Sequence, residues 1–263
     1  MNAKGYLKYL LSVESYSFSL DEIAQATSGS RNSLKFELLR LSDKGEIVNL
    51  RKGFYLIITP RYSSLKKLPV QLYSEKLFNH LNKNYYLGLF SAAKFHGASH
   101  QQVQRDYIVT DKPKLNDISK NALDIRFFTA TKWPDRNIQQ KTCDAGNFNV
   151  SSPALTIVDL INHQTKLGGL NRMLATIEEL SEELTESDVS DLLSWYPNKS
   201  SLQRFGFFLE EFKGNEGLKE MIFEHLKTKH FYPVLLIPKS NEKPGAVNNK
   251  WKVDINLKLE NDL

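Results

Sequence analysis

Five polar residues with the chemistry of nucleic-acid recognition lie close together near position 30. They are Ser30, Arg31, Asn32, Ser33 and Lys35. Arginine and asparagine can each make two hydrogen bonds to the edge of a base, whereas lysine and serine more often hold phosphate groups. In a helix-turn-helix, the start of the recognition helix enters the major groove of DNA. The types and order of these residues therefore predict a DNA-binding surface.

A second pair of cations, Arg51 and Lys52, stands before Gly53 in a short polar break. The break separates residues 46–50 from residues 54–58, and both segments are rich in β-branched and aromatic residues. This pattern is typical of a β-hairpin with the two cations at its tip. The tip of such a wing meets the DNA backbone or the minor groove. We therefore add Arg51 and Lys52 to the predicted DNA-binding residues.

Helices and the hairpin must position these side chains. Ser19 and Glu22 have the spacing of a capping box, which starts a short helix. A turn at residues 27–29 leads into a longer helix over about residues 30–44. With a packing helix before it and the hairpin after it, the stretch 18–62 predicts a winged helix-turn-helix.

The longer helix is apolar on two faces. Leu34, Leu38 and Leu41 repeat at the spacing of a helix face that packs on a core. Phe36 and Leu39 lie on the opposite side of the same helix. We expect these two side chains to pack against the first helix or against the second domain. Because the helix has two apolar faces, its sequence does not define which polar face meets DNA.

The excess positive charge of the chain is confined to its first quarter. The 263 residues carry a net charge of +5. Residues 1–68 hold 11 Lys and Arg against 6 Asp and Glu, whereas the remaining residues hold 24 of each sign. Attraction to phosphate is the simplest use for a localised basic module. The alternative is a solvated surface on a small helical module that contacts protein.

Residues 63–69 are polar and basic and end in a proline, which favours a domain boundary there. We predict an α+β protein with a winged helix-turn-helix over residues 1–64, followed by a larger mixed α/β domain over residues 65–263. The second domain is expected to contain helices over 70–81 and 87–95, strands over 105–110, 125–129, 138–142 and 148–150, a helical section from Ser152–Pro153 to about residue 227, and C-terminal strands over 232–237 and 251–259.

The last expected strand shows the most regular pattern in the chain. Trp251, Val253, Ile255, Leu257 and Leu259 alternate with polar residues. Strict alternation is typical of a strand that is buried on one face, and such strands are common in antiparallel sheets. We therefore predict a half-buried antiparallel strand at this end of the chain.

A search for catalytic motifs finds none. The sequence contains no phosphate-binding glycine loop, no dinucleotide-binding fingerprint, no nucleophile elbow and no zinc-protease helix motif. His96 and His100 have the spacing of metal ligands, but Gly97 lies between them and no carboxylate stands near, which favours a structural role for His96. Residues 211–213 match the Glu-x-Lys pattern of some nucleases but lie on a helical pattern. We predict no catalytic residues, no metal site and no cofactor.

Composition narrows the class of protein further. The single cysteine, Cys143, excludes a disulfide within the chain. No apolar run approaches the roughly 20 residues that a membrane-spanning helix needs, and the first residues lack the pattern of a signal peptide. We expect a cytoplasmic protein that does not bind a membrane.

Four segments resemble one family of proteins. The segment over residues 85–102, YYLGLFSAAKFHGASHQQ, carries most of the resemblance. The hairpin residues 48–55, the segment 152–160 and the residues around Trp251 in 249–256 add to it. Together these segments resemble the AbiEi family, whose members are antitoxins and transcriptional regulators of abortive-infection systems that defend against phage.

The resemblance implies a specific function. Members of the family repress a shared promoter by binding inverted repeats in double-stranded DNA through a winged helix. They are paired with a nucleotidyltransferase-like toxin that is encoded alongside. The second domain supplies antitoxin activity, in a type IV arrangement that does not require direct contact with the toxin. The resemblance thus implies a DNA-binding autoregulator and antitoxin that is not an enzyme.

Two other functions stay open from the residues themselves. The first is a nucleic-acid enzyme, in which a winged helix directs a divergent nuclease-like domain to its substrate. The second is an interaction protein in which both domains bind other proteins. Metal-dependent cleavage would favour the first, and a lack of affinity for DNA upstream of the protein's own gene would favour the second.

Overall fold

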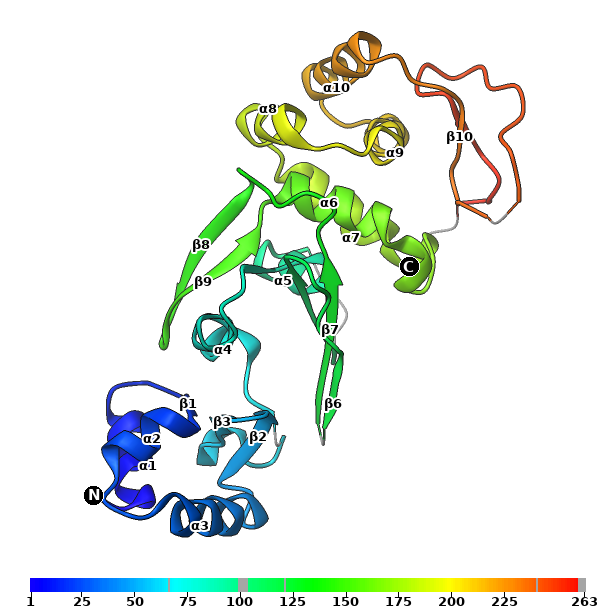
Figure 1. Cartoon of the computed structure of the whole chain (residues 1–263). Coiled ribbons are helices and arrows are strands. Elements are labelled where there is room, and N and C mark those ends of the chain that lie inside the picture. The colour runs from blue at the N-terminus through cyan, green and yellow to red at the C-terminus, as the bar shows by residue number, and fades with distance from the viewer. Residues whose placement is uncertain (66, 99–103, 121, 240, 260–263) are drawn as a thin grey trace. The chain divides into compact units, whose positions relative to one another are not determined.

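The computed structural model describes the whole chain except residues 66, 99–103, 121, 240 and 260–263. Helices and strands are mixed along the chain, which confirms the predicted α+β class (Figure 1). The predicted boundary between residues 64 and 65 lies inside the first of two units and stays a prediction. The first unit comprises Met1–Tyr86, Gln104–Thr129 and Gln140–Asn149, and the second comprises Leu87–Val103, Ala130–Gln139 and Val150–Leu263.

The N-terminal module consists of three helices and a small antiparallel sheet, drawn in blue in Figure 1. The strand order is β1-β3-β2, with β3 paired to both neighbours. Strand β1 was not predicted, whereas the helices and the β2–β3 hairpin lie where the sequence placed them. The elements are α1 (Ala3–Ser12), β1 (Ser17–Ser19), α2 (Leu20–Ala26), α3 (Arg31–Asp43), β2 (Ile47–Arg51) and β3 (Phe54–Ile57).

Local hydrogen bonds explain why these elements begin and end where they do. The predicted capping box is present at α2, because Ser19 Oγ accepts from the Glu22 amide at 3.1 Å and Glu22 Oε2 accepts from the Ser19 amide at 2.5 Å. Ser30 caps α3 with a single bond, because its Oγ accepts from the Ser33 amide. Gly45 and Gly53 have positive φ, which only glycine adopts readily, at the end of α3 and in the hairpin turn.

The core of this module is made by the apolar faces of all three helices and the sheet. Leu34, Leu38 and Leu41 of α3 are buried, as their spacing predicts. Phe18 of β1 is fully buried, and its ring stacks on that of Tyr55 with 5.3 Å between the centroids. Burial of these side chains provides the main driving force for the module.

The next segment differs from its prediction. A continuous helix was expected over residues 70–81, but the chain forms a 3-10 turn, η2 (Val70–Leu72), and a separate helix, α4 (Ser74–Leu81). Tyr73 breaks the helix with backbone angles φ −140° and ψ −9°. Its side chain is only 1% exposed. The prediction was wrong because the apolar spacing of this segment does not reveal the break at Tyr73.

A six-stranded sheet follows, with the strand order β6-β7-β5-β4-β9-β8. Strand β5 runs parallel to β7, and β6 runs antiparallel to it. The four predicted strands are confirmed, and two more, β4 and β6, were missed. The strands are β4 (Tyr85–Leu87), β5 (Asp106–Thr110), β6 (Ile118–Lys120), β7 (Leu123–Thr129), β8 (Ile138–Cys143) and β9 (Gly146–Ser151).

Strand β4 overlaps the start of a predicted helix at Leu87. The predicted helix over 87–95 begins only at Leu89, as α5 (Leu89–Phe95). All three residues of β4 are buried, so the strand shows no alternation of polar and apolar side chains. A short apolar run of this kind cannot be distinguished from a buried helix by periodicity.

The predicted helical section is confirmed. The helix α6 begins at Pro153, and Ser152 Oγ accepts a hydrogen bond from the Leu155 amide at 3.4 Å. Proline suits this first position because its missing N–H would have no partner there. The section contains α6 (Pro153–Asn162), the short turns η3 (Gln164–Lys166) and η4 (Asn171–Met173), α7 (Leu174–Glu182), α8 (Glu186–Trp195), α9 (Lys199–Glu211) and α10 (Glu216–Thr228).

The C-terminal strands are shorter than predicted, and their direction differs from the predicted one. Within the described residues, β10 (Val234–Leu235) and β11 (Val253–Asp254) pair over two residues, and they run parallel. Ile255 is 55% exposed, although it was expected on the buried face. Beyond these two pairs, a side chain replaces backbone pairing between the two segments. Asn256 accepts a hydrogen bond from the Ile237 amide at 2.9 Å and donates one to the Ile237 carbonyl at 3.0 Å.

Candidate nucleic-acid interface

The predicted DNA-binding residues at the start of α3 are brought together on the surface. Arg31, Asn32, Ser33 and Lys35 are exposed. Ser30 Oγ accepts a hydrogen bond from the Ser33 amide at 3.2 Å, and this bond orders the first turn of the helix. The cap therefore positions the four side chains that follow it, and an anion meets the positive end of the helix dipole there.

Arg31 already has one partner on the module. Its guanidinium forms an ion pair with Asp21 of α2. The two side chains are 65% and 69% exposed, and ion pairs in water contribute about 1 kcal/mol or less. Exchange of Asp21 for a phosphate or a guanine edge is therefore inexpensive, and the pair holds the guanidinium in front of α3.

The hairpin cations have different surroundings. Lys52 is exposed in the turn between β2 and β3. Arg51 is half-buried, because its Nη2 donates to the Asn116 carbonyl at 2.6 Å and its guanidinium lies 5.0 Å from the centre of the Phe127 ring. Burial lowers the pKa of Arg51. Arg51 therefore holds the hairpin, and Lys52 faces solvent.

A second contact supports the same hairpin. Lys120 of β6 donates from Nζ to the Asn49 carbonyl of β2 at 3.1 Å. Together with the contacts of Arg51, this bond joins the β2–β3 hairpin to Asn116, Lys120 and Phe127, which lie in or next to β6 and β7. No local pattern in the sequence predicts these contacts, since the partners lie 65 and 71 residues apart.

The outer face of α3 departs from the prediction. Phe36 and Leu39 were expected to pack on the first helix or on the second domain, but they are 66% and 57% exposed. At about 100° of rotation per residue they lie opposite the buried leucine stripe. Lys35 and Arg40 are exposed on either side of them. Arg40 was not among the predicted site residues, although the same helical angles place it beside this face.

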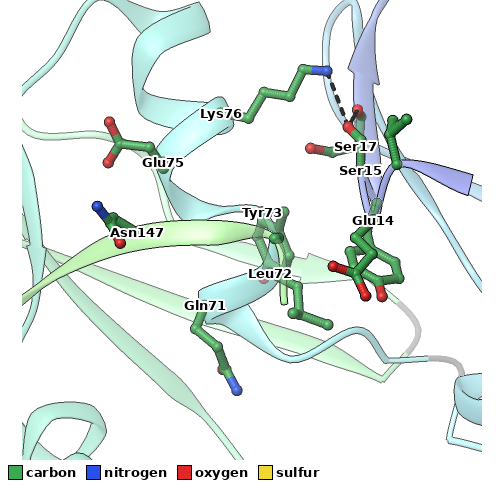
Figure 2. A pocket seen from close by; sticks show the side chains of 12 residues that line it. Glu14, Ser15, Ser17, Gln71, Leu72, Tyr73, Glu75, Lys76 and Asn147 are labelled. Carbon is green, nitrogen blue, oxygen red and sulfur yellow. Dashed lines mark hydrogen bonds between the residues drawn. The ribbon is translucent and has the colours of Figure 1, made fainter. Parts of the chain in front are cut away.

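A small hollow lies beside the module. It has a volume of about 90 Å³ and is lined mainly by residues 13–17 and 71–76 (Figure 2). Lys76 lies on its wall and reaches Ser15 Oγ at 3.4 Å and Glu22 Oε1 at 3.0 Å. Burial raises the pKa of Glu22, but hydrogen bonds from the Ser19 amide and Lys76 bring it below its usual value. These contacts hold α4 to the module.

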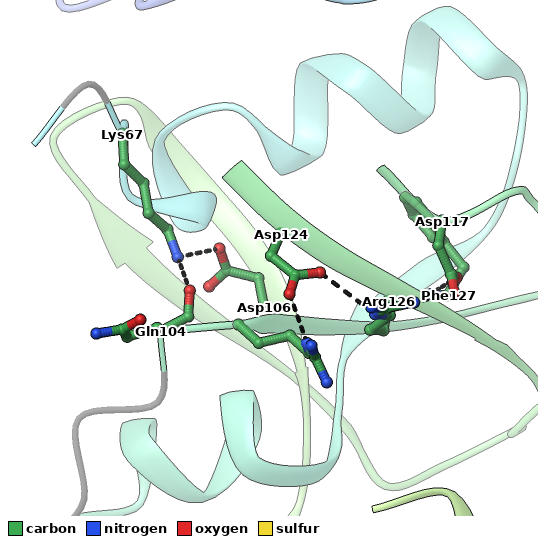
Figure 3. Close-up of polar contacts among 8 residues, drawn as sticks. Lys67, Gln104, Asp106, Asp117, Asp124, Arg126 and Phe127 are labelled. Atoms are coloured by element: carbon green, nitrogen blue, oxygen red, sulfur yellow. Dashed lines mark hydrogen bonds and ion pairs between the residues drawn. The ribbon is translucent and has the colours of Figure 1, made fainter. Parts of the chain in front are cut away.

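The carboxylates of the six-stranded sheet are the natural candidates for nuclease chemistry. Asp106, Asp117 and Asp124 come from or precede β5, β6 and β7 (Figure 3). In the described part of the chain, no group of three or more histidine, cysteine or acidic residues is arranged to hold a metal ion. The three carboxylates pair instead with cations, as Lys67–Asp106 at 3.0 Å, Arg105–Asp124 at 2.7 Å, Arg126–Asp124 at 3.3 Å and Arg126–Asp117 at 3.1 Å.

Comparison with protein families identifies a domain that makes up just under half of the chain. Residues 86–211 match the family model of the AbiEi antitoxin C-terminal domain. The chain carries an AbiEi antitoxin C-terminal domain. This confirms the resemblance to the AbiEi family and supports a toxin–antitoxin role. The family is one of antitoxins and not of enzymes. The AbiEi domain, as we call residues 86–211, begins in β4 and ends in α9.

The fold as a whole has a solved counterpart. The crystal structure of the RV2827C protein from Mycobacterium tuberculosis superposes with a TM-score of 0.66, over 95% of this chain and 90% of that chain. The sequence identity is 14%, so the likeness shows a shared fold. No curated protein matches the sequence.

The residues of the AbiEi domain that carried the resemblance have packing roles. His96 ends α5, and its Nε2 donates to the Ser151 carbonyl at 2.7 Å. The Ser151 and Thr156 hydroxyls lie 2.7 Å apart at the start of α6. These bonds give His96 the structural role that the sequence favoured, whereas His100 lies outside the described residues.

A buried polar network in the AbiEi domain was not predicted. Asn137 accepts from Trp195 Nε1 at 2.8 Å and donates to Asp188 Oδ1 at 2.7 Å. The other oxygen of Asp188 accepts from the Ala154 amide at 2.8 Å. The network therefore joins the residue before β8 to α6 and α8, and its members lie too far apart in the sequence to form a recognisable motif.

Two side chains of α9 hold the C-terminal segment. Arg204 is buried and donates to the carbonyls of Leu235 and Leu236 at 2.7–3.0 Å. Burial lowers the pKa of Arg204 to about 10. Gln203 donates to the Tyr232 carbonyl at 2.9 Å and to that of Trp251 at 3.0 Å. The side chains of Arg204 and Gln203 thus donate hydrogen bonds to backbone carbonyls. In a regular sheet, the amides of a neighbouring strand would make these bonds.

Finally, the described residues include no helix that is both long and apolar enough to cross a membrane.

Proposed function

We propose that the chain is the DNA-binding autoregulator and antitoxin of an AbiE-like phage-defence system. In this proposal, the N-terminal module acts as a winged helix-turn-helix and represses its own operon at inverted repeats. The AbiEi domain counteracts a nucleotidyltransferase toxin that is encoded alongside. This function places the protein in the cytoplasm, with the DNA. The domains would be residues 1–64 and residues 65–263.

One observation carries the DNA-binding part. The exposed polar side chains that follow Ser30 and the exposed cation Lys52 belong to residues 1–68, whose excess of positive charge equals the net charge of the whole chain. The proposed roles are base contacts by Arg31 and Asn32, phosphate contacts by Ser30, Ser33 and Lys35, and a backbone contact by Lys52. Arg51, which was grouped with Lys52 from the sequence, would serve mainly by holding the hairpin in place.

A binding titration tests this proposal. Fluorescence anisotropy with a labelled duplex from the region upstream of the gene, at several salt concentrations, measures both affinity and salt dependence. Arg31→Ala should weaken binding by about 1–3 kcal/mol if it contacts a base. Lys52→Ala should weaken binding to all sequences alike and reduce the salt slope by about one. If neither change alters binding, the proposed face is wrong.

The antitoxin part is tested separately. The neighbouring nucleotidyltransferase gene is expressed from an inducible promoter, with or without the full-length chain from an independent promoter. We expect growth arrest with the toxin alone and normal growth with both proteins. Lys52→Ala is the matched control, because it should weaken repression and leave the rescue of growth unchanged. Failure of the unaltered chain to rescue growth would contradict an antitoxin function for this pair.

A further inference from the structure

The proposed base contacts leave one feature of α3 without a use, an apolar ridge formed by Phe36 and Leu39. The two residues are three positions apart, so their side chains are neighbours on the helix surface. Both are exposed, on the side opposite the leucines that anchor α3 in the core. Contiguous exposed apolar side chains mark binding surfaces more often than isolated ones do.

The charges around the ridge indicate what covers it. Lys35 and Arg40 are exposed and lie about 70° to either side of the ridge on the helix. An apolar line with a cation on each flank is complementary to the major groove, because phosphates form both walls of the groove and base edges form its floor. Asp43 lies on the same line near the end of α3 and is exposed. Its carboxylate would be repelled there, which limits the contact to the part of the helix before its last turn.

One base offers an apolar group on that floor. Thymine carries a methyl group on C5 that faces the major groove, and apolar side chains contact it. We infer that Phe36 and Leu39 recognise thymine methyl groups in the operator, so that the chain selects sites with thymine opposite the middle of α3. This inference rests on the proposed DNA-binding function and adds the base class that the outer face of the helix reads.

The test uses DNA with and without the methyl groups. The region upstream of the gene is amplified once with dTTP and once with dUTP, which pairs in the same way but lacks the methyl. Binding of the full-length chain to each duplex is measured by anisotropy at one salt concentration. Loss of one buried methyl weakens binding by about fourfold. We expect the unaltered chain to bind the uracil duplex at least about fourfold more weakly than the thymine duplex.

Variants assign the effect to the ridge. The double variant Phe36→Ala, Leu39→Ala should bind both duplexes with the same affinity, and Leu39→Ala alone should reduce the difference. Tyr9→Ala removes a side chain of α1 that is also exposed, and it should keep the full difference. Thermal unfolding of each variant checks that it is folded, which is expected because these side chains are exposed.

The possible outcomes distinguish a failure of thymine recognition from a failure of DNA binding. If the unaltered chain binds neither duplex, the DNA-binding function fails and the inference fails with it. If it binds both duplexes equally, or if the double variant keeps the difference, DNA binding stands and the inference is overturned. A fall in molecular mass of the double variant by light scattering, with no methyl preference in the unaltered chain, would assign the ridge to a second copy and also overturn it.

Discussion

The N-terminal module and the AbiEi domain use their polar side chains in opposite ways. In the N-terminal module, Lys35, Arg40 and Lys52 are exposed, and even the apolar Phe36 faces solvent. In the AbiEi domain, polar residues are buried and bonded to the domain itself or to the C-terminal segment. These are Asn137, Thr156, Gln164, Gln203 and Arg204.

The difference distinguishes side chains that can bind an external partner from side chains that stabilise the fold. A buried polar group must have hydrogen-bond partners, and a network of such groups specifies one arrangement of the chain. Exposed cations leave most of their charge available to an external partner. The AbiEi domain also contains a stretch, residues 173–198, with seven acidic residues and no lysine or arginine. Because this stretch repels phosphate, it supports the proposal that DNA contact belongs to the N-terminal module, while the buried polar side chains of the AbiEi domain have structural roles.

The largest expected effect concerns packing at α9. A Cβ atom on Gly206 would lie 2.1 Å from Cζ3 of the fully buried Trp251, whereas a Cβ on Gly29 would have no atom within 4 Å. Gly206→Ala should therefore destabilise the protein by about 3 kcal/mol, near the upper end for overpacked cores. Gly29→Ala, in the turn before α3, is the matched control and should change stability by less than about 0.5 kcal/mol. Urea unfolding followed by circular dichroism measures both, and similar midpoints would contradict the assigned packing.

The next effect is a pH dependence in the AbiEi domain. Burial, followed by the charge of Lys166, lowers the pKa of His163 to about 4 from an ordinary value near 6.5. The unfolded chain thus binds a proton at higher pH than the folded chain, and stability falls as the pH drops from about 6.5 to about 4. The expected loss is up to about 3 kcal/mol.

The variant His163→Gln separates the contribution of His163 to the pH dependence of stability from the contribution of the carboxylates. Unfolding free energies of both proteins are measured at pH 7 and pH 4.5. The variant should lose less stability than the unaltered chain over this interval, because glutamine does not titrate. Parallel losses in the two proteins would show that His163 is accessible to protons in the folded state.

The hairpin cations offer a smaller and more selective test. Arg51→Ala removes the contact with the Phe127 ring and the bond to Asn116, and it should cost about 1–2 kcal/mol of stability. Lys52→Ala should leave the thermal midpoint almost unchanged. The order should reverse in the salt dependence of DNA binding, where Lys52 has the larger effect. Equal effects of both variants on stability would remove the distinction drawn between holding the hairpin and binding DNA.

The smallest expected difference compares helix caps in the two regions. Ser19 and Glu22 satisfy each other's amides, whereas Thr185 accepts one hydrogen bond from the Asp188 amide at 3.2 Å. Ser19→Ala should cost about 1 kcal/mol, and Thr185→Ala about half of that. Thermal unfolding of both variants checks the order. A larger loss at Thr185 would mean that the cap of α8 also stabilises the Asn137 network.

Local signals in the sequence were sufficient to predict most elements of the N-terminal module. The capping box at Ser19, the glycines that end α3 and turn the hairpin, and the leucine stripe each involve residues within a few positions of one another. The same holds for the start of α6 at Ser152 and Pro153. Helices, caps and tight turns depend on neighbours in the chain, so their residues can be read in order.

Tertiary structure decided the rest. Strands β1 and β4 carry weak local patterns and exist because strands far along the chain, β3 and β9, pair with them. Strand β6 is only three residues long and pairs with its sequence neighbour β7. The direction of β11 could not be read from alternation, since its partner β10 and the side chains of Arg204 and Gln203 lie far away in the chain. A break at Tyr73 likewise interrupts a segment whose spacing is helical.

For the candidate site, the sequence alone determined which side chains could meet DNA and where the positive charge lies. Only the tertiary structure separated Arg51 from Lys52, because the ring of Phe127 and the carbonyl of Asn116 come from another part of the chain. It also decided the exposure of Phe36 and Leu39, since an apolar residue is exposed or buried according to what packs against it. Residue type sets what a side chain can bind, and packing sets whether it is available to bind.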